Sequence, residues 1–68
     1  MRLDLLAKDG NSGNLGCPSV YLAADGSLVV QGNIVDGDTH DELHNVLPGE
    51  GAVHISADVV AAALRKLG

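Results

Sequence analysis

Two β-prone runs separated by an Asp-Gly pair constrain this chain most strongly. Residues 20–23 and 28–31 are mostly apolar and flank a short segment that contains Asp25-Gly26. Asp-Gly between apolar runs is typical of a two-residue type I′ hairpin, because both central residues of that turn adopt positive φ. We therefore expect a β-hairpin over residues 19–31.

Both faces of this hairpin are expected to be apolar. In the two-residue register Leu22 faces Val29 and Tyr21 faces Val30, so one face carries Val20, Leu22 and Val29. A sheet wetted on one side alternates apolar and polar residues, so each of these faces needs a cover. A helix of this chain can cover one face. We hypothesise that a second molecule covers the face of Val20, Leu22 and Val29, and Tyr21 is the anchor if the faces are exchanged.

The remaining elements complete an α+β pattern. Short strands are expected near residues 2–7, where Leu6 interrupts the alternation, and near 52–55. Ser56 is a typical N-cap for a helix over 57–67. The apolar stripe of that helix consists of Val60, Ala63, Leu64 and Leu67. We predict a single domain, residues 1–68, with a small antiparallel sheet and the C-terminal helix packed on one face.

A second, shorter helix is expected between the hairpin and the last strand. Residues 39–47 can form it, with Asp38 or Thr39 as N-cap and acidic residues in the first turn. The segment Pro48-Gly49 would end it.

Length and composition leave little material for a core. The chain has 68 residues, Tyr21 is its single aromatic residue, and Cys17 is its single cysteine, which excludes an internal disulfide. Domains of this size are marginally stable alone, so a core shared in a homodimer is attractive. One unpaired thiol fits a reducing compartment. With no signal peptide or membrane span in the pattern, we expect a soluble, cytoplasmic protein.

The charge balance argues against direct contact with nucleic acid. The net charge is −5, and the basic residues are Arg2, Lys8, Arg65 and Lys66. Nucleic-acid binders need a basic footprint that neutralises phosphates. Four cations at the two ends of the chain provide one only if the fold brings the ends together or if the cations are paired across a dimer. An acidic surface instead favours a basic protein partner.

Two histidines at helical spacing suggest an alternative, metal-binding function. His40 and His44 are at i and i+4, which would place them on one helix face. A third ligand would have to come from Asp36, Asp38, His54 or Cys17. We interpret the pair as a polar, solvated helix face, and we expect no cofactor.

Catalysis is not expected. Cys17 could act as a nucleophile only beside a base or in a cationic environment. A chain of this length also offers little wall for a substrate pocket. We therefore expect a protein that is not an enzyme.

A motif in the hairpin carries a family resemblance. The segments are Gly16-Cys17-Pro18-Ser19-Val20-Tyr21, Asp25-Gly26 and Leu28-Val29-Val30-Gln31-Gly32. They resemble a family of short proteins from Streptomyces and related actinobacteria. The layout is also similar to a domain-of-unknown-function family encoded beside Xre-type helix-turn-helix regulators (the WhiJ-associated type), but this chain lacks the Trp residues usual there. The resemblance implies a regulatory accessory protein, not an enzyme. We expect such a protein to homodimerise, to bind a transcriptional regulator, or both.

Overall fold

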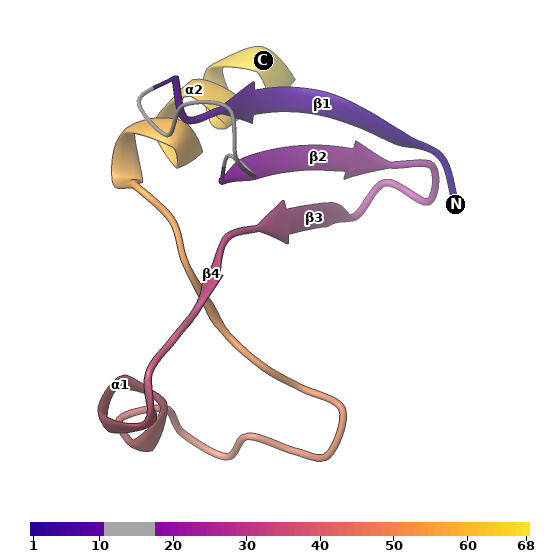
Figure 1. Cartoon of the computed structure of the whole chain (residues 1–68). Coiled ribbons are helices and arrows are strands. Elements are labelled where there is room, and N and C mark those ends of the chain that lie inside the picture. Colours follow the sequence, from indigo (N-terminus) through magenta and orange to yellow (C-terminus); the bar gives the residue numbers. More distant parts are fainter. Residues whose placement is uncertain (11–17) are drawn as a thin grey trace.

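The fold combines a three-stranded sheet, a helix and a protruding segment (Figure 1). A computed structural model describes residues 1–10 and 18–68, so predictions that involve Cys17 lie outside the described residues. The strands are β1 (Leu3–Lys8), β2 (Ser19–Ala23), β3 (Leu28–Gln31), β4 (Asn33–Ile34) and β5 (Val53–His54). The helices are α1 (Gly37–Asp41) and α2 (Ala57–Leu67).

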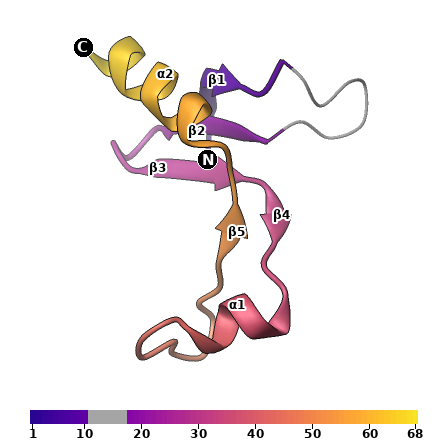
Figure 2. The same cartoon turned by 90° about the vertical axis from the view of Figure 1, so that its left-hand side faces the viewer.

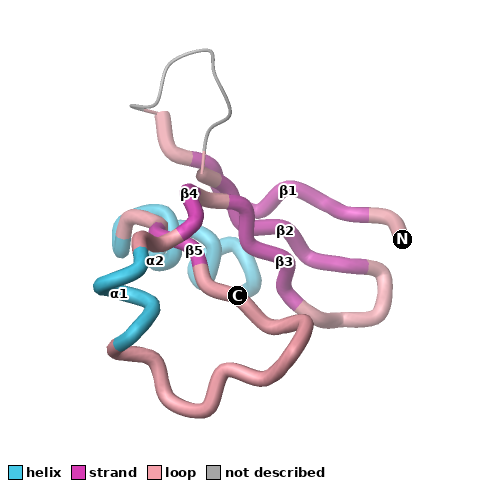
Figure 3. The backbone as a smooth tube through the Cα atoms, turned by 60° about the horizontal axis from the view of Figure 1, so that its bottom comes forward, coloured by secondary structure: helices cyan, strands magenta, loops and turns pink. Residues whose placement is uncertain are grey.

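The main sheet confirms the predicted α+β architecture. Its order is β1-β2-β3, with antiparallel neighbours, and α2 packs on β1 and β2 from one side. Figure 3 shows the three strands side by side, with the N-terminus at one end of β1. The strand expected near 52–55 forms as β5, but it pairs with β4 in a separate two-stranded ribbon. No helix within the described ranges is long and apolar enough to cross a membrane.

The hairpin forms as predicted, but its register differs by one residue. Tyr21 pairs with Val29, and the loop has three residues, because Ala23 N–H donates to the Ser27 carbonyl at 2.8 Å. Gly26 has a φ of +88°, whereas Asp25 is not in the positive-φ region that a type I′ turn requires. The Asp25 carboxylate accepts hydrogen bonds from both Ser27 N–H (3.0 Å) and Ser27 Oγ (2.6 Å). This clamp favours a three-residue loop with Gly26 at the left-handed position.

The register change exchanges residues between the two faces of the sheet. Val20 now pairs with Val30 and Leu22 with Leu28, so these four share the face under α2. Val29 moves to the other face, beside Tyr21. The predicted face of Val20, Leu22 and Val29 is therefore wrong as a set.

A bulge in β1 explains why Leu6 interrupts the alternation. The pairing with β2 shifts between Leu5 and Ala7, which leaves Leu6 as the extra residue. Leu6 and Ala7 consequently both pack against the core beneath α2, whereas Leu5 stays on the opposite face. The bulge adds one apolar side chain to a core that has few.

Helix α2 begins and ends as predicted. Ser56 Oγ accepts from Asp58 N–H at 3.2 Å, and Gly68 closes the C-terminus. The core beneath the helix is small: Val20 is 3 % exposed, Val59 6 % and Ala63 1 %. Of the predicted apolar stripe only Ala63 is buried, so α2 is rotated about its axis and packs with a different face than expected.

Residues 32–54, which we name the arm, project away from the rest of the chain, the body (Figures 1 and 2). The arm contains β4, α1 and β5. Gly32 lies at its base, where a Cβ would overlap the His54 carbonyl oxygen. The arm leaves the sheet at the end of β3 and returns at the start of α2.

The predicted helix over 39–47 is wrong in extent. Helix α1 covers only Gly37–Asp41, and its N-cap is Asp36. Asn45 adopts a φ of +56°, which a helix cannot continue through. Pro48 also disfavours helical backbone at Leu47.

Candidate interaction surfaces

The four residues predicted to mediate association fall into different environments. Val20 belongs to the core and Leu22 is half-buried on the same side of the sheet. Tyr21 and Val29 pair with each other on the opposite side, away from α2. The structure therefore separates this set, and only Tyr21 and Val29 lie together on an uncovered face.

This uncovered side of the sheet is apolar. We name it the open sheet face; by register it carries Leu3, Leu5, Tyr21, Val29 and the buried Ala23, with Ser19 and Gln31 at one end. Leu5, Tyr21 and Val29 form a row across all three strands, and Leu3, Leu5 and Val29 are exposed. Tyr21 Oη donates a 2.9 Å hydrogen bond to Gln31 Oε1, which holds the ring along the edge of the row. Sequence reasoning missed Leu3 and Leu5, although their alternation in β1 is visible in the sequence.

A second apolar surface lies where α2 stops covering the sheet. All of β3 is exposed, including Leu28 and Val30 on the helix side. On α2, Asp58 and Ala62 line a pocket with the end of β1. Because successive residues of an α-helix are 100° apart around its axis, the flank of α2 opposite Asp58 and Ala62 points toward β3. We name the resulting surface the α2–β3 ledge; its residues are Leu28, Val30, Val60, Leu64 and Leu67.

The outer face of α2 also lacks the charges expected of a surface helix. Opposite the buried Val59 lie Ala57, Ala61 and Gly68, all exposed. Surface helices normally carry polar residues on that side, whereas in α2 the charged Asp58 and Arg65 lie on the flank away from β3. The apolar residues of α2 thus extend well beyond the part that its own sheet covers.

The fold separates the charges of the chain into two regions. The arm carries five acidic residues and no Lys or Arg, whereas the body carries four acidic and four basic residues. The acidic residues of the arm are Asp36, Asp38, Asp41, Glu42 and Glu50. The body is therefore neutral, and the whole net charge of −5 lies on the arm.

Two carboxylates have local hydrogen bonds that favour their charged form. Hydrogen bonds from Ser27 lower the pKa of Asp25, first from the hydroxyl and then from the backbone N–H. Thr39 lowers the pKa of Asp36 in the same way, first through its hydroxyl and then through its N–H, which lies 2.8 Å from Asp36 Oδ1. Both carboxylates fix turns, so their negative charge is part of the local structure.

The structure does not bring the metal-ligand candidates together. Helix α1 ends at Asp41, so His40 and His44 do not share a helix face. Among the described residues no three His, Cys, Asp or Glu side chains are close enough to hold a metal ion. The basis for the metal-binding alternative, two histidines at helical spacing, is therefore lost.

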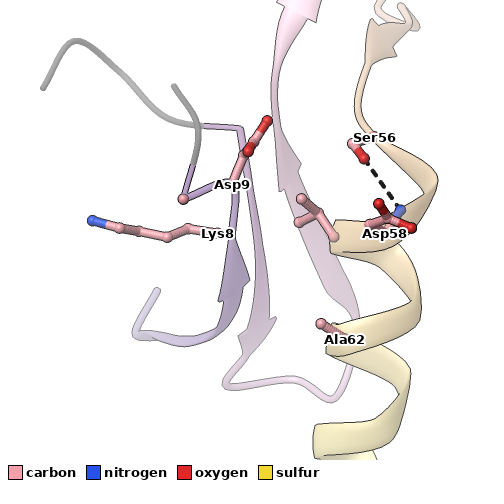
Figure 4. Close-up of a pocket in the computed structure, with 7 residues that line it drawn as sticks. Lys8, Asp9, Ser56, Asp58 and Ala62 are labelled. Atoms are coloured by element: carbon pink, nitrogen blue, oxygen red, sulfur yellow. Dashed lines mark hydrogen bonds between the residues drawn. The ribbon is translucent and has the colours of Figure 1, made fainter. Parts of the chain in front are cut away.

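A pocket of about 220 Å³ lies between the end of β1 and the start of α2 (Figure 4). Its lining includes Lys8, Asp9, Asp58 and Ala62, and the Lys8 side chain points away from the helix. Ligand pockets usually enclose 300 Å³ or more, roughly. The described pocket is too small to argue for an active site.

Comparison with protein-family models, with curated proteins and with solved structures found no match. The two apolar surfaces and the acidic arm are the main functional features of the described residues.

Proposed function

We propose that this chain is a protein-interaction module, not an enzyme, that self-associates through its neutral body and offers its acidic arm to a basic protein partner. The separation of charge between arm and body supports this most directly. Two neutral bodies can meet without net repulsion, whereas an arm of charge −5 attracts a cationic surface over long range.

The exposed area supports self-association. The chain exposes 5165 Å², whereas the size scaling of folded monomers gives about 4,000 Å² for its mass. Its Cα radius of gyration is 13.0 Å, against about 11 Å for a compact domain of this length. The excess, about 1,200 Å², includes the surface of the projecting arm and is therefore an upper limit on the area available to a partner, against roughly 800 Å² per partner in a standard interface.

The first expected result is a dimer in solution. Light scattering at micromolar concentration should give twice the chain mass of 6.9 kDa. Added salt should not change this mass, because salt screens charges and the contact between neutral bodies is apolar. Reductant and chelator should leave the mass unchanged. A folded monomer at every accessible concentration would remove the self-association half of the proposal.

A regulator of the helix-turn-helix type is the partner that the family resemblance suggests. Proteins that bind DNA carry basic surfaces, so the charge of the arm suits one. We keep this partner as a hypothesis, and the chemistry of the arm can be tested without it.

Neutralising the arm is expected to weaken binding of a basic probe. The probe is a fluorescein-labelled helical Lys/Leu peptide, and the variant combines Asp38→Asn with Glu42→Gln. Fluorescence anisotropy should show affinity about fivefold lower, since each exposed charge contributes up to ~1 kcal/mol, and lower affinity again at high salt.

A body variant with the same change in charge is the matched control. Asp4→Asn with Asp58→Asn also removes two negative charges, but from the neutral body. Its affinity for the peptide should stay within about twofold of the unmodified chain. Equal losses in the two variants would mean that the arm has no special role.

A further inference from the structure

The α2–β3 ledge leaves two parts of the chain incompletely covered. A helix about 10 Å wide spans two strands spaced 4.8 Å apart, so α2 covers β1 and β2 but leaves β3 open. Helix α2 in turn lacks a cover over the flank of Val60 and Leu64 and over its outer face at Ala61. Among the described residues, β3 therefore lacks a covering helix and the outer face of α2 lacks a covering sheet.

We propose that the ledge is the homodimer interface, in which α2 of each copy lies beside the partner's α2 and across the partner's β3. This inference rests on the proposed self-association and specifies its surface. A two-fold interface is self-complementary, so each copy supplies the element that the other lacks.

Packing distances determine the layers of this dimer. Neighbouring helices lie 8–10 Å apart, roughly two strand spacings. Two sheets in one layer would overlap at that separation, so they must lie on opposite sides of the helix pair. The dimer is thus a sheet–helix pair–sheet sandwich with parallel helices, and the small side chains of Ala57 and Ala61 allow the partner's β3 to approach the outer face of α2.

The lack of charge on the ledge and the exposure of its side chains favour a second copy over a different protein. None of the five ledge residues is charged, so the ledge offers no ion-pair partner to a basic or acidic ligand. Each arm leaves from its own β3, and in the two-fold sandwich the two arms extend from opposite edges, which keeps their negative charges apart. The ledge side chains are 37–57 % exposed in the single chain, where a dimer would bury them.

A pair of charge substitutions tests the surface. Leu64→Asp should raise the dimer dissociation constant about 100-fold or more, because each copy would bury an unpaired carboxylate against an apolar partner. The matched control, Leu5→Asp on the open sheet face, should leave the dimer intact. Leu64 and Leu5 are 57 % and 50 % exposed, so both variants should keep the far-ultraviolet circular dichroism of the unmodified chain.

The outcomes separate this inference from the proposed function. If the unmodified chain dimerises and Leu64→Asp has no effect on the mass, the ledge is not the interface although self-association stands. Dissociation by Leu5→Asp alone would assign the dimer to the open sheet face and overturn the ledge. A monomeric unmodified chain overturns both.

Cysteine cross-linking tests the parallel arrangement of the helices. With Cys17 replaced by Ser, Val60→Cys and Leu67→Cys should each form disulfide-linked dimers under mild oxidation, since parallel two-fold helices bring each residue near its own copy. Arg65→Cys, on the flank away from β3, is the control and should remain monomeric in non-reducing electrophoresis. Cross-linking of Arg65→Cys but neither ledge cysteine would overturn the arrangement.

Discussion

Val59→Asp is expected to unfold the chain. Val59 is 6 % exposed and belongs to the three-residue buried cluster between α2 and the sheet. A carboxylate there has no basic partner among the residues that form the cluster, and an uncompensated buried charge costs several kcal/mol. A domain of this size has only about 3–5 kcal/mol of stability to lose. Circular dichroism should show loss of the helix signal at 25 °C, a temperature at which most domains remain folded.

Val60→Asp is the matched control for this result. It places the same side chain one position along the same helix, where the native residue is already 37 % exposed. The intrinsic helix propensity of the new residue is the same in both variants, and the helix N-terminus favours Asp at position 59 if anything, so a greater loss in Val59→Asp reports burial. Val60→Asp should remain folded and lose only dimer affinity. A folded Val59→Asp variant would show that the cluster is not the core.

Gly32→Ala is expected to open the base of the arm. The added Cβ would overlap the backbone carbonyl oxygen of His54, and a backbone atom cannot rotate away as a side chain can. The chain must then open the pairing of β4 with β5, at a cost of ~1–3 kcal/mol or more. Hydrogen exchange should report it at the Val35 amide, which donates to the Ala52 carbonyl at 3.3 Å. That amide should lose protection while amides within β2 keep theirs.

Gly37→Ala is the control for the glycine change. A Cβ at Gly37 meets no atom within 4 Å, and its backbone φ is not positive. Alanine favours helix over glycine by about 1 kcal/mol, so α1 should become slightly more stable. Loss of Val35 protection in Gly37→Ala as well would mean that the arm responds to any glycine replacement.

Local signals in the sequence were sufficient for several elements. Ser56 and Gly68 delimit a helix by capping, which depends on neighbouring backbone groups alone, and α2 has the predicted bounds. The β-prone runs around Asp25-Gly26 likewise specify a hairpin, since turn formation is local. Leu6, which interrupts the alternation, is the extra residue of a bulge that the sequence analysis did not predict.

Predictions failed where the outcome depends on contacts between side chains or between segments. The register of the hairpin depends on the bonds from Ser27 to Asp25, which turn-type preference alone does not include. Only α1 forms within the expected helix over 39–47, because none of its residues is buried against another described element, and packing supplies most helical stability. Its loss also removed the shared helix face of His40 and His44.

The sequence by itself determined the α+β content, the capped helix, the hairpin and a net charge of −5, because these follow from composition and short-range preference. Only the tertiary structure decided where the charge lies and which apolar residues stay uncovered. The pairing of β4 with β5 holds residues 32–54 together as the arm, which carries five acidic residues and no Lys or Arg. The rotation of α2 about its axis buries Val59 and leaves Leu64 exposed. Strand β3 also stays uncovered, since a single helix is wide enough for only two of the three strands.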